Sequence, residues 1–333
     1  MSRKTTSNKE AALNSPGLSR RSFLGLSAAA AAGLTAVSVP AARAQGLGNT
    51  TTFVFIHGSW HGAWCFQFVA NELISNGFRL VVRDLPGFGL TAQFPSSYLA
   101  GNLNPNELSP LASSTLDDYV NSVAPTILEL RQAFRGPLIV VGHSLAGITL
   151  NELGERLGRE VIDHLVYLTA FMTPAGQTAN DVANLQIQDG TLLGTVLVGD
   201  SNVSGALRLN PNSTDPTYQT NAKNTFYNDV PAQMIPAIFN LLTPDQPLQP
   251  KSVTTSITRE RWGRVPRTFI RCTLDQCIPI ATQDTLIQAA DAFTPGNPTQ
   301  VVSLQSSHSP FFSMPAQLAA VLRQAARAAE KGH

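Results

Sequence analysis

Short runs of apolar residues alternate along the chain with stretches in which apolar positions recur at helical spacing. The apolar runs are typical of strands buried on both faces of a sheet, and the helical spacing predicts amphipathic helices. We predict strands at residues 51–57, 79–84, 138–141, 164–169, 267–272 and 300–304, and helices at 61–75, 116–134, 145–157 and 314–329. This order indicates an α/β fold with a mostly parallel sheet of about six strands and helices on both faces.

The segment between the fourth and fifth predicted strands interrupts this alternation. Residues 173–262 are rich in Asn, Pro and Thr and contain no clear strand, and we expect helical pieces near 179–189 and 231–242. Plain loops of that length are uncommon in compact domains. We therefore predict that residues 173–262, called the cap segment below, form an inserted helical cap. The core of the fold would then comprise residues 45–172 and 263–333.

The first 44 residues do not fit the alternation. A polar, basic start precedes an uncharged Ala- and Gly-rich stretch at residues 23–39, and Ala42 and Ala44 supply the small residues of a cleavage site. This order is typical of a secretory signal peptide, and SRRSFL at residues 19–24 resembles the twin-arginine export signal. We predict a cleaved signal peptide at residues 1–44, recognised by the twin-arginine export machinery, and a periplasmic or secreted mature protein. A retained anchor is the alternative, although the stretch is short and weakly apolar for a membrane span.

Composition narrows the classes of function. Charged residues are 14% of the chain, and the formal net charge is +1. Removal of residues 1–44 leaves 17 basic and 21 acidic residues, so the mature chain lacks the basic excess typical of nucleic-acid binding. The three cysteines are too few for a disulfide scaffold, and none pairs with a histidine at metal-ligand spacing. We expect no metal and no cofactor, and whether Cys272 and Cys277 are bonded stays open.

The motif with the most chemical content is GHSLAG at residues 142–147, where a predicted buried strand turns directly into a predicted helix. This arrangement is typical of a nucleophile elbow, in which a serine at the apex of a strained turn projects above the sheet. The usual pattern has glycine two residues after the serine. Here Ala146 takes that place, and because alanine is also small we expect the turn to be kept around Ser144.

A serine nucleophile requires a base and an acid that orients the base. His308 follows the sixth predicted strand, and Asp275 follows the fifth. Asp284 is the alternative acid, but it lies in the helix beyond. The chain order Ser144, Asp275, His308 is the order of nucleophile, acid and base that accompanies such an elbow. We therefore predict these three residues as the catalytic triad.

The same chemistry requires an oxyanion hole built from two backbone N–H groups. We expect one from Leu145, directly after the nucleophile, and one from Ser59, in the loop after the first strand. Gly58 permits close approach of the backbone to the substrate carbonyl. Gly58, Trp60 and His143 are the predicted substrate-pocket residues. Because the cap segment holds few charges, we expect a mainly apolar acyl or alcohol group.

The segment FIHGSWHGAWC at residues 55–65 is similar to the HGxxHGAWxW segment of one branch of the α/β-hydrolases. That branch contains plant methyl-ester esterases, hydroxynitrile lyases and bacterial pyrethroid-type esterases. The resemblance implies an α/β-hydrolase core, a helical cap and a Ser–His–Asp triad. It covers roughly residues 51–172 and 265–325, and further matching blocks are Gly142-His143-Ser144, Cys272-Thr273-Leu274-Asp275, Ile278-Pro279 and His308.

Two positions distinguish hydrolases from lyases within this branch. The lyases resemble this sequence but carry Thr in place of Gly58 and Lys directly after the catalytic histidine, where this chain has Ser309. We therefore predict a serine hydrolase that cleaves small to medium, mainly apolar carboxylic esters through an acyl-enzyme. An amidase or lactonase with the same triad, a hydroxynitrile lyase, and a non-catalytic binding protein on this fold are the alternatives. The individual ester and the oligomeric state are not readable from the sequence.

Overall fold

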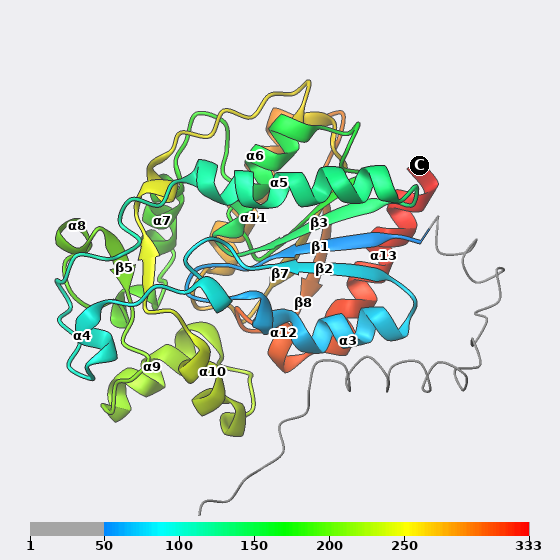
Figure 1. Cartoon of the computed structure of the whole chain (residues 1–333). Helices are drawn as coiled ribbons and strands as arrows, with labels where there is room; N and C mark the ends of the chain where they lie inside the picture. Colours follow the sequence, from blue (N-terminus) through cyan, green and yellow to red (C-terminus); the bar gives the residue numbers. More distant parts are fainter. Residues whose placement is uncertain (1–49, 333) are drawn as a thin grey trace, which may run out of the picture. The chain divides into compact units, whose positions relative to one another are not determined.

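The fold is known from a computed structural model that describes residues 50–332; the predicted signal peptide lies outside the described residues. Six parallel strands form one sheet in the order β2-β1-β3-β4-β7-β8 (Figure 1). The predicted α/β-hydrolase fold, with a sheet of about six strands, is confirmed. The strands are β1 (Thr52–Ile56), β2 (Arg79–Arg83), β3 (Leu138–His143), β4 (His164–Leu168), β7 (Arg267–Cys272) and β8 (Gln300–Leu304).

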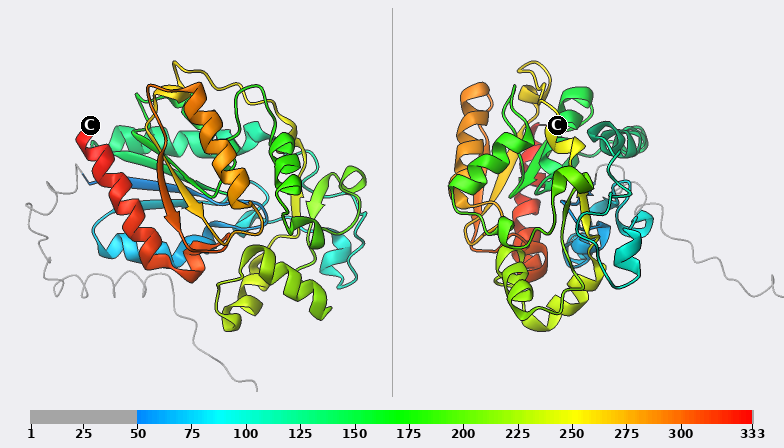
Figure 2. Two further views of the ribbon diagram at one scale, coloured as in Figure 1. Left: turned by 180° about the vertical axis from the view of Figure 1, so that it is seen from behind. Right: turned by 90° about the vertical axis from the view of Figure 1, so that its left-hand side faces the viewer.

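Long helices cover both faces of this sheet (Figures 1 and 2). The chain moves in one direction from β1 to β2 and in the other from β2 onward, so right-handed crossovers place α3 on one face and α5, α6 and α11 on the other. Helix α13 follows the last strand and packs against α3. This double cover explains why β1, β3 and β4 are buried along their whole length. The helices are α3 (Gln67–Ser75), α5 (Leu116–Ala133), α6 (Ala146–Leu157), α11 (Ile280–Phe293) and α13 (Pro315–Gly332).

The cap segment lies beyond the carboxyl end of the sheet (Figure 1). It contains helices, as expected, but also an antiparallel pair of three-residue strands that were not predicted from the sequence. These strands read Ala-Leu-Arg and Asp-Gln-Pro, which are too short and too polar to show a period. The elements are α7 (Ala179–Gln188), α8 (Ser201–Ser204), β5 (Ala206–Arg208), α9 (Pro216–Phe226), α10 (Ile235–Leu241) and β6 (Asp245–Pro247); outside the cap segment, α4 (Ser96–Leu99) and α12 (Pro310–Ser313) are single turns.

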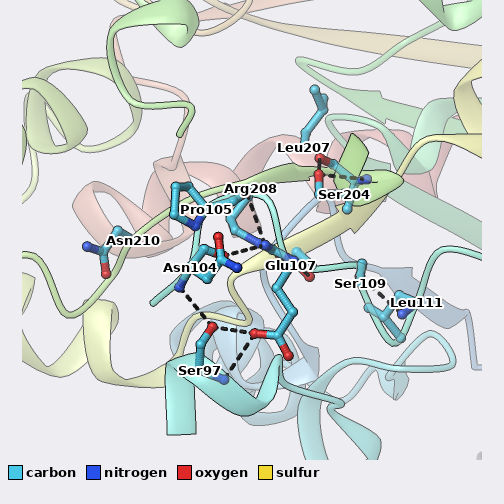
Figure 3. Close-up of polar contacts among 12 residues, drawn as sticks. Ser97, Asn104, Pro105, Glu107, Ser109, Leu111, Ser204, Leu207, Arg208 and Asn210 are labelled. Carbon is cyan, nitrogen blue, oxygen red and sulfur yellow. Dashed lines mark hydrogen bonds and ion pairs between the residues drawn. The ribbon is translucent and has the colours of Figure 1, made fainter. Parts of the chain in front are cut away.

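A buried ion pair joins the two cap strands to the core. Arg208 on β5 donates from Nε and Nη2 to the two carboxylate oxygens of Asp245 on β6, at 2.6 and 2.7 Å, and both side chains are fully buried. Its Nη1 donates to the backbone carbonyls of Asn104 and Pro105, in the loop before α5 (Figure 3). All the polar groups of this pair are therefore matched to partners that lie far apart in sequence.

No helix within residues 50–332 is both long and apolar enough to cross a membrane.

Candidate active site

Ser144 occupies the turn between β3 and α6, with a left-handed φ of 55°. A left-handed conformation is strained for a residue with a side chain, and strain of this kind is typical of a nucleophile elbow. Helix α6 packs closely against the backbone of Phe171 at Gly147, where an added Cβ would lie 2.5 Å from the carbonyl oxygen of Phe171. Glycine is therefore required at 147, whereas Ala146 fits as the first residue of the helix.

Asp275 lies in the loop after β7 and accepts four hydrogen bonds. Oδ2 accepts from Nδ1 of His308 at 2.7 Å and from Oγ1 of Thr169 at 2.6 Å. Oδ1 accepts from the backbone N–H groups of Cys277 and Ile278, at 2.7 and 2.8 Å. The carboxylate is buried, and its four donors fix its orientation toward the histidine.

The imidazole of His308 is also buried, and this burial disfavours its charged form. The negative charge of the Asp275 carboxylate and its hydrogen bond to Nδ1 outweigh burial and raise the pKa of His308 above its usual value. The Cys277 group itself stays a thiol, because burial raises its pKa. Within the described residues the Ser144 hydroxyl makes no hydrogen bond to His308, and such contacts commonly form only when substrate binds.

His143 supports the base from the strand side. Its Nε2 donates to the backbone carbonyl of His308 at 2.9 Å, and the two rings lie 4.5 Å apart. The side chain is fully buried and does not line the cavity described below, so the structure places this predicted pocket residue behind the base. Since His143 directly precedes Ser144, this contact ties the loop that carries His308 to the strand that ends at Ser144.

The two expected oxyanion-hole residues, Ser59 and Leu145, line one cavity together with Ser144. Neither backbone N–H donates a hydrogen bond to another group in the described part of the chain, so both are available to a ligand. Gly58 packs directly against the nucleophile, and an added Cβ there would lie 2.7 Å from the Cβ of Ser144. The geometry thus provides a nucleophile and two free donors at one point.

His57 orients one of these donors. Its Nδ1 donates to the Gly58 carbonyl at 2.8 Å, while its Nε2 accepts from the Leu85 N–H at 3.0 Å. The Gly58 carbonyl and the Ser59 N–H belong to one planar peptide unit, so fixing the carbonyl also fixes the direction of the N–H. Burial lowers the pKa of His57 to about 4, which keeps the ring neutral and in this tautomer. His57 thus fixes the loop that carries Ser59.

The cavity beside Ser144 is mostly apolar and is completed by the cap segment. Trp60, one of the predicted pocket residues, lines it with a φ of 61°. Its Nε1 donates to the Leu207 carbonyl at 3.0 Å, and its own carbonyl accepts from the Thr243 N–H at 2.9 Å. The remaining lining residues are Phe171, Gln186, Leu193, Leu207, Lys251 and Cys277.

Several residues of the site were not predicted from the sequence. Thr169 follows β4, and Cys277 lies two residues after Asp275, so proximity to strand ends could have indicated both. Lys251 lies in the cap segment, where no motif marked it. The alternative acid Asp284 forms an ion pair with Arg271 instead of reaching the base.

The cysteines are buried free thiols, which answers the question left open for Cys272 and Cys277. No cluster of three or more candidate metal ligands occurs among the residues that the structure describes.

Comparison with known proteins identifies the family. Residues 53–321 match the alpha/beta hydrolase family, and the chain belongs to it. Two of the relatives are chloroplastic proteins of Arabidopsis thaliana, numbers 11 and 13 of its methylesterase series. Number 11 is 25% identical over 84% of this chain, and number 13 is 24% identical over 82%. The chain spans only 65% and 56% of the lengths of these two relatives.

Two comparisons with pyrethroid hydrolases cover more of the relative's own length. A pyrethroid hydrolase of Sphingobium wenxiniae is 27% identical over 81% of this chain and 86% of its own length. The crystal structure of a pyrethroid hydrolase shares 25% identity and a TM-score of 0.63, over 84% of this chain and 98% of that one. The crystal structure of polyneuridine aldehyde esterase, at 18% identity and a TM-score of 0.63, shows the shared fold alone.

Proposed function

We propose that this member of the alpha/beta hydrolase family hydrolyses carboxylic esters with Ser144 as nucleophile, His308 as base and Asp275 as the orienting acid. The observation that supports this most strongly is the convergence at one cavity of the strained serine and two unpaired backbone N–H groups. The buried Asp275–His308 pair supplies a base whose tautomer is fixed. These are the parts that acyl transfer by a serine requires.

In the proposed reaction, Ser144 Oγ attacks the ester carbonyl and passes its proton to Nε2 of His308. The N–H groups of Ser59 and Leu145 bind the negatively charged oxygen of the tetrahedral intermediate. His308 then donates the proton to the departing alcohol, which leaves an acyl-enzyme. Water, deprotonated by His308, releases the acid and restores the serine.

The relatives support an ester as the substrate, because they include a methylesterase and a pyrethroid hydrolase. The apolar cavity wall, formed by Trp60, Phe171, Leu193 and Leu207, supports a small to medium, mainly apolar group on that ester. An amidase or lactonase would use the same groups. At position 58 the resembling lyases carry a threonine hydroxyl, whereas this chain has glycine. At position 309 they carry a lysine ammonium, whereas this chain has serine.

The test is turnover of p-nitrophenyl esters of increasing chain length, methyl esters and bulky aromatic esters by wild type and Ser144→Ala. We expect the substitution to lower kcat by about 10⁴- to 10⁶-fold. Ser309→Ala, which removes a buried hydroxyl without a partner among the described residues, is the matched control and should retain activity. Undiminished ester turnover by Ser144→Ala would refute the mechanism. Cleavage of p-nitroanilides alone would indicate an amidase, and release of cyanide from mandelonitrile would indicate a lyase.

We also propose that residues 1–44 direct twin-arginine export, with cleavage near Ala44, to the periplasm or the medium. The support is the order of basic, apolar and small residues in the sequence. Substitution of both Arg20 and Arg21 by Lys in the full chain should retain the unprocessed protein in the cytoplasm of a bacterial host. Equal amounts of processed, exported protein from both forms would contradict this proposal.

A further inference from the structure

Lys251 lines the cavity beside Ser144 but has no part in the reaction above. It lies in a 3-10 turn of the cap segment, Gln249–Ser252, and is only 6% exposed. Its ammonium has neither a hydrogen-bond acceptor nor an ion-pair partner among the residues that the structure describes. Lysines are rarely buried without a partner, because removing an ammonium from water is costly. The position therefore calls for an explanation.

The cavity wall supplies no negative charge to this ammonium. The other lining residues are Ser59, Trp60, Ser144, Leu145, Phe171, Gln186, Leu193, Leu207 and Cys277, none of which is acidic. Burial lowers the pKa of Lys251 to about 8, so the side chain is still mostly protonated at neutral pH. The cavity wall thus carries one cationic side chain, and its other side chains are uncharged and mostly apolar.

The turn that holds Lys251 is fixed on both sides. The side-chain carbonyl of Gln249 accepts from the N–H of Leu116, the first residue of α5, at 3.1 Å. The Ser252 hydroxyl accepts from the side-chain amide of Asn180 on α7 at 3.3 Å. Because both neighbours are tied to helices, the lysine is held in the cavity wall by the fold.

We propose that Lys251 selects esters that carry a second, negatively charged oxygen group, with a carboxylate as the chemical class. This inference rests on the proposed ester hydrolysis and makes its substrate more specific: a mainly apolar ester with one anionic end. The carboxylate would supply the acceptor that Lys251 lacks among the described residues, and a charge-assisted hydrogen bond to a largely buried ammonium is among the stronger polar contacts. A neutral ester of the same shape would leave the ammonium unpaired.

The test compares anionic esters with neutral isosteres. The probes are the methyl half-esters of C4 to C8 dicarboxylic acids and the acetate esters of hydroxyalkanoic acids of similar length, each beside its primary amide. The ratio of kcat/KM for carboxylate over amide is measured for wild type, Lys251→Met, Lys251→Arg and Lys223→Met. Lys223, on α9 of the cap segment, is the matched control, and the melting temperature of each variant is recorded.

We expect wild type to prefer the carboxylate at one or more chain lengths. Lys251→Met should lower the preference about 10- to 100-fold, chiefly through KM, because one charged hydrogen bond is lost. Lys251→Arg should retain part of the preference, and Lys223→Met all of it. A wild type without the preference at any length, or a Lys251→Met protein that keeps it, would overturn the proposal.

Calorimetric binding to the Ser144→Ala protein separates this proposal from the proposed function. It requires no turnover, and the same ester pairs are titrated into Ser144→Ala and Ser144→Ala/Lys251→Met. If wild type hydrolyses no ester, the hydrolase assignment fails, yet a carboxylate preference in binding that depends on Lys251 would support the anion site. Equal binding of carboxylate and amide to both proteins would overturn the anion site.

Discussion

Replacement of Asp275 by Asn tests the proposed mechanism with the least change of shape. Asp275 accepts from the Cys277 and Ile278 N–H groups through one oxygen and from Thr169 and His308 through the other. The asparagine carbonyl can keep the two backbone donors, which fixes the amide orientation. Its NH₂ group then faces the Thr169 hydroxyl and Nδ1 of His308, and both were donors to the carboxylate.

The consequence for His308 follows from donor and acceptor matching. The threonine hydroxyl can rotate and accept, but the imidazole can accept at Nδ1 only by moving its proton to Nε2. An Nε2 that carries a proton cannot take the proton of Ser144. We therefore expect Asp275→Asn to lower kcat by about 10³- to 10⁴-fold, which corresponds to about 4 to 5.5 kcal/mol in the activation barrier.

The assay is kcat and kcat/KM for a p-nitrophenyl ester between pH 5 and 10. Only neutral His308 acts as a base, and Asp275 raises the pKa of His308, so wild-type kcat/KM should rise through a midpoint above the ordinary value of about 6.5. In Asp275→Asn the midpoint of the residual activity should move to lower pH.

The free energy of unfolding should fall with rising pH, in contrast to kcat/KM, which rises. A raised folded-state pKa stabilises the folded protein below the unfolded value of about 6.5, and this contribution is lost as the pH rises through the folded-state pKa.

Asp284→Asn is the matched control, because it removes a carboxylate from the same loop and helix region but breaks only an ion pair with Arg271. This variant should keep kcat within about threefold, as partly exposed ion pairs contribute little. The reasoning is refuted if Asp275→Asn, folded by circular dichroism, retains more than a tenth of wild-type kcat. It is refuted equally if Asp284→Asn loses as much activity as Asp275→Asn.

Two further substitutions test the supports of the site. His57→Phe removes the donor that fixes the Gly58 carbonyl, and we expect kcat to fall about 10- to 100-fold with a smaller change in KM, measured with the same ester; an unchanged kcat would exclude a positioning role. Arg208→Met leaves Asp245 buried and unpaired, so urea unfolding should show a loss of about 3 to 5 kcal/mol. Arg208→Met/Asp245→Leu should recover much of that loss, and a single-variant cost below about 1 kcal/mol would contradict the anchoring role.

The central strands were predictable because they are buried on both faces. The run at residues 138–141, for example, is wholly apolar and marks the start of β3, and the candidate nucleophile then follows from its place after that strand. Ser144, Asp275 and His308 could all be proposed in this way, since each lies one to four residues after the end of a strand. The site of an α/β sheet lies at these strand ends, so a correct strand assignment largely determines the candidate residues.

The predicted pocket residue His143 shows where sequence adjacency misleads. It stands next to the nucleophile in the chain, but successive side chains at the end of a strand point to opposite sides. The ring therefore packs behind the site and donates to the carbonyl of His308. Helix α9 was missed for a different reason, because most of its positions are polar and no apolar stripe indicates a helix.

The proposed oxyanion hole depends both on the core, which the sequence predicts well, and on the cap segment, which it predicts poorly. Ser59 is held on one side through Gly58, whose carbonyl accepts from His57 of the core, and on the other through Trp60, whose indole and carbonyl bond to the cap segment. The hydrogen bond within the core, from His57 to Gly58, lies inside a recognisable motif. The hydrogen bonds between Trp60 and the cap segment join residues more than a hundred positions apart. The Ser59 N–H, the proposed oxyanion donor, thus takes its position from both parts of the chain. Since Lys251 also comes from the cap segment, the proposed substrate selection and the proposed oxyanion geometry would both depend on how the cap segment packs on the core.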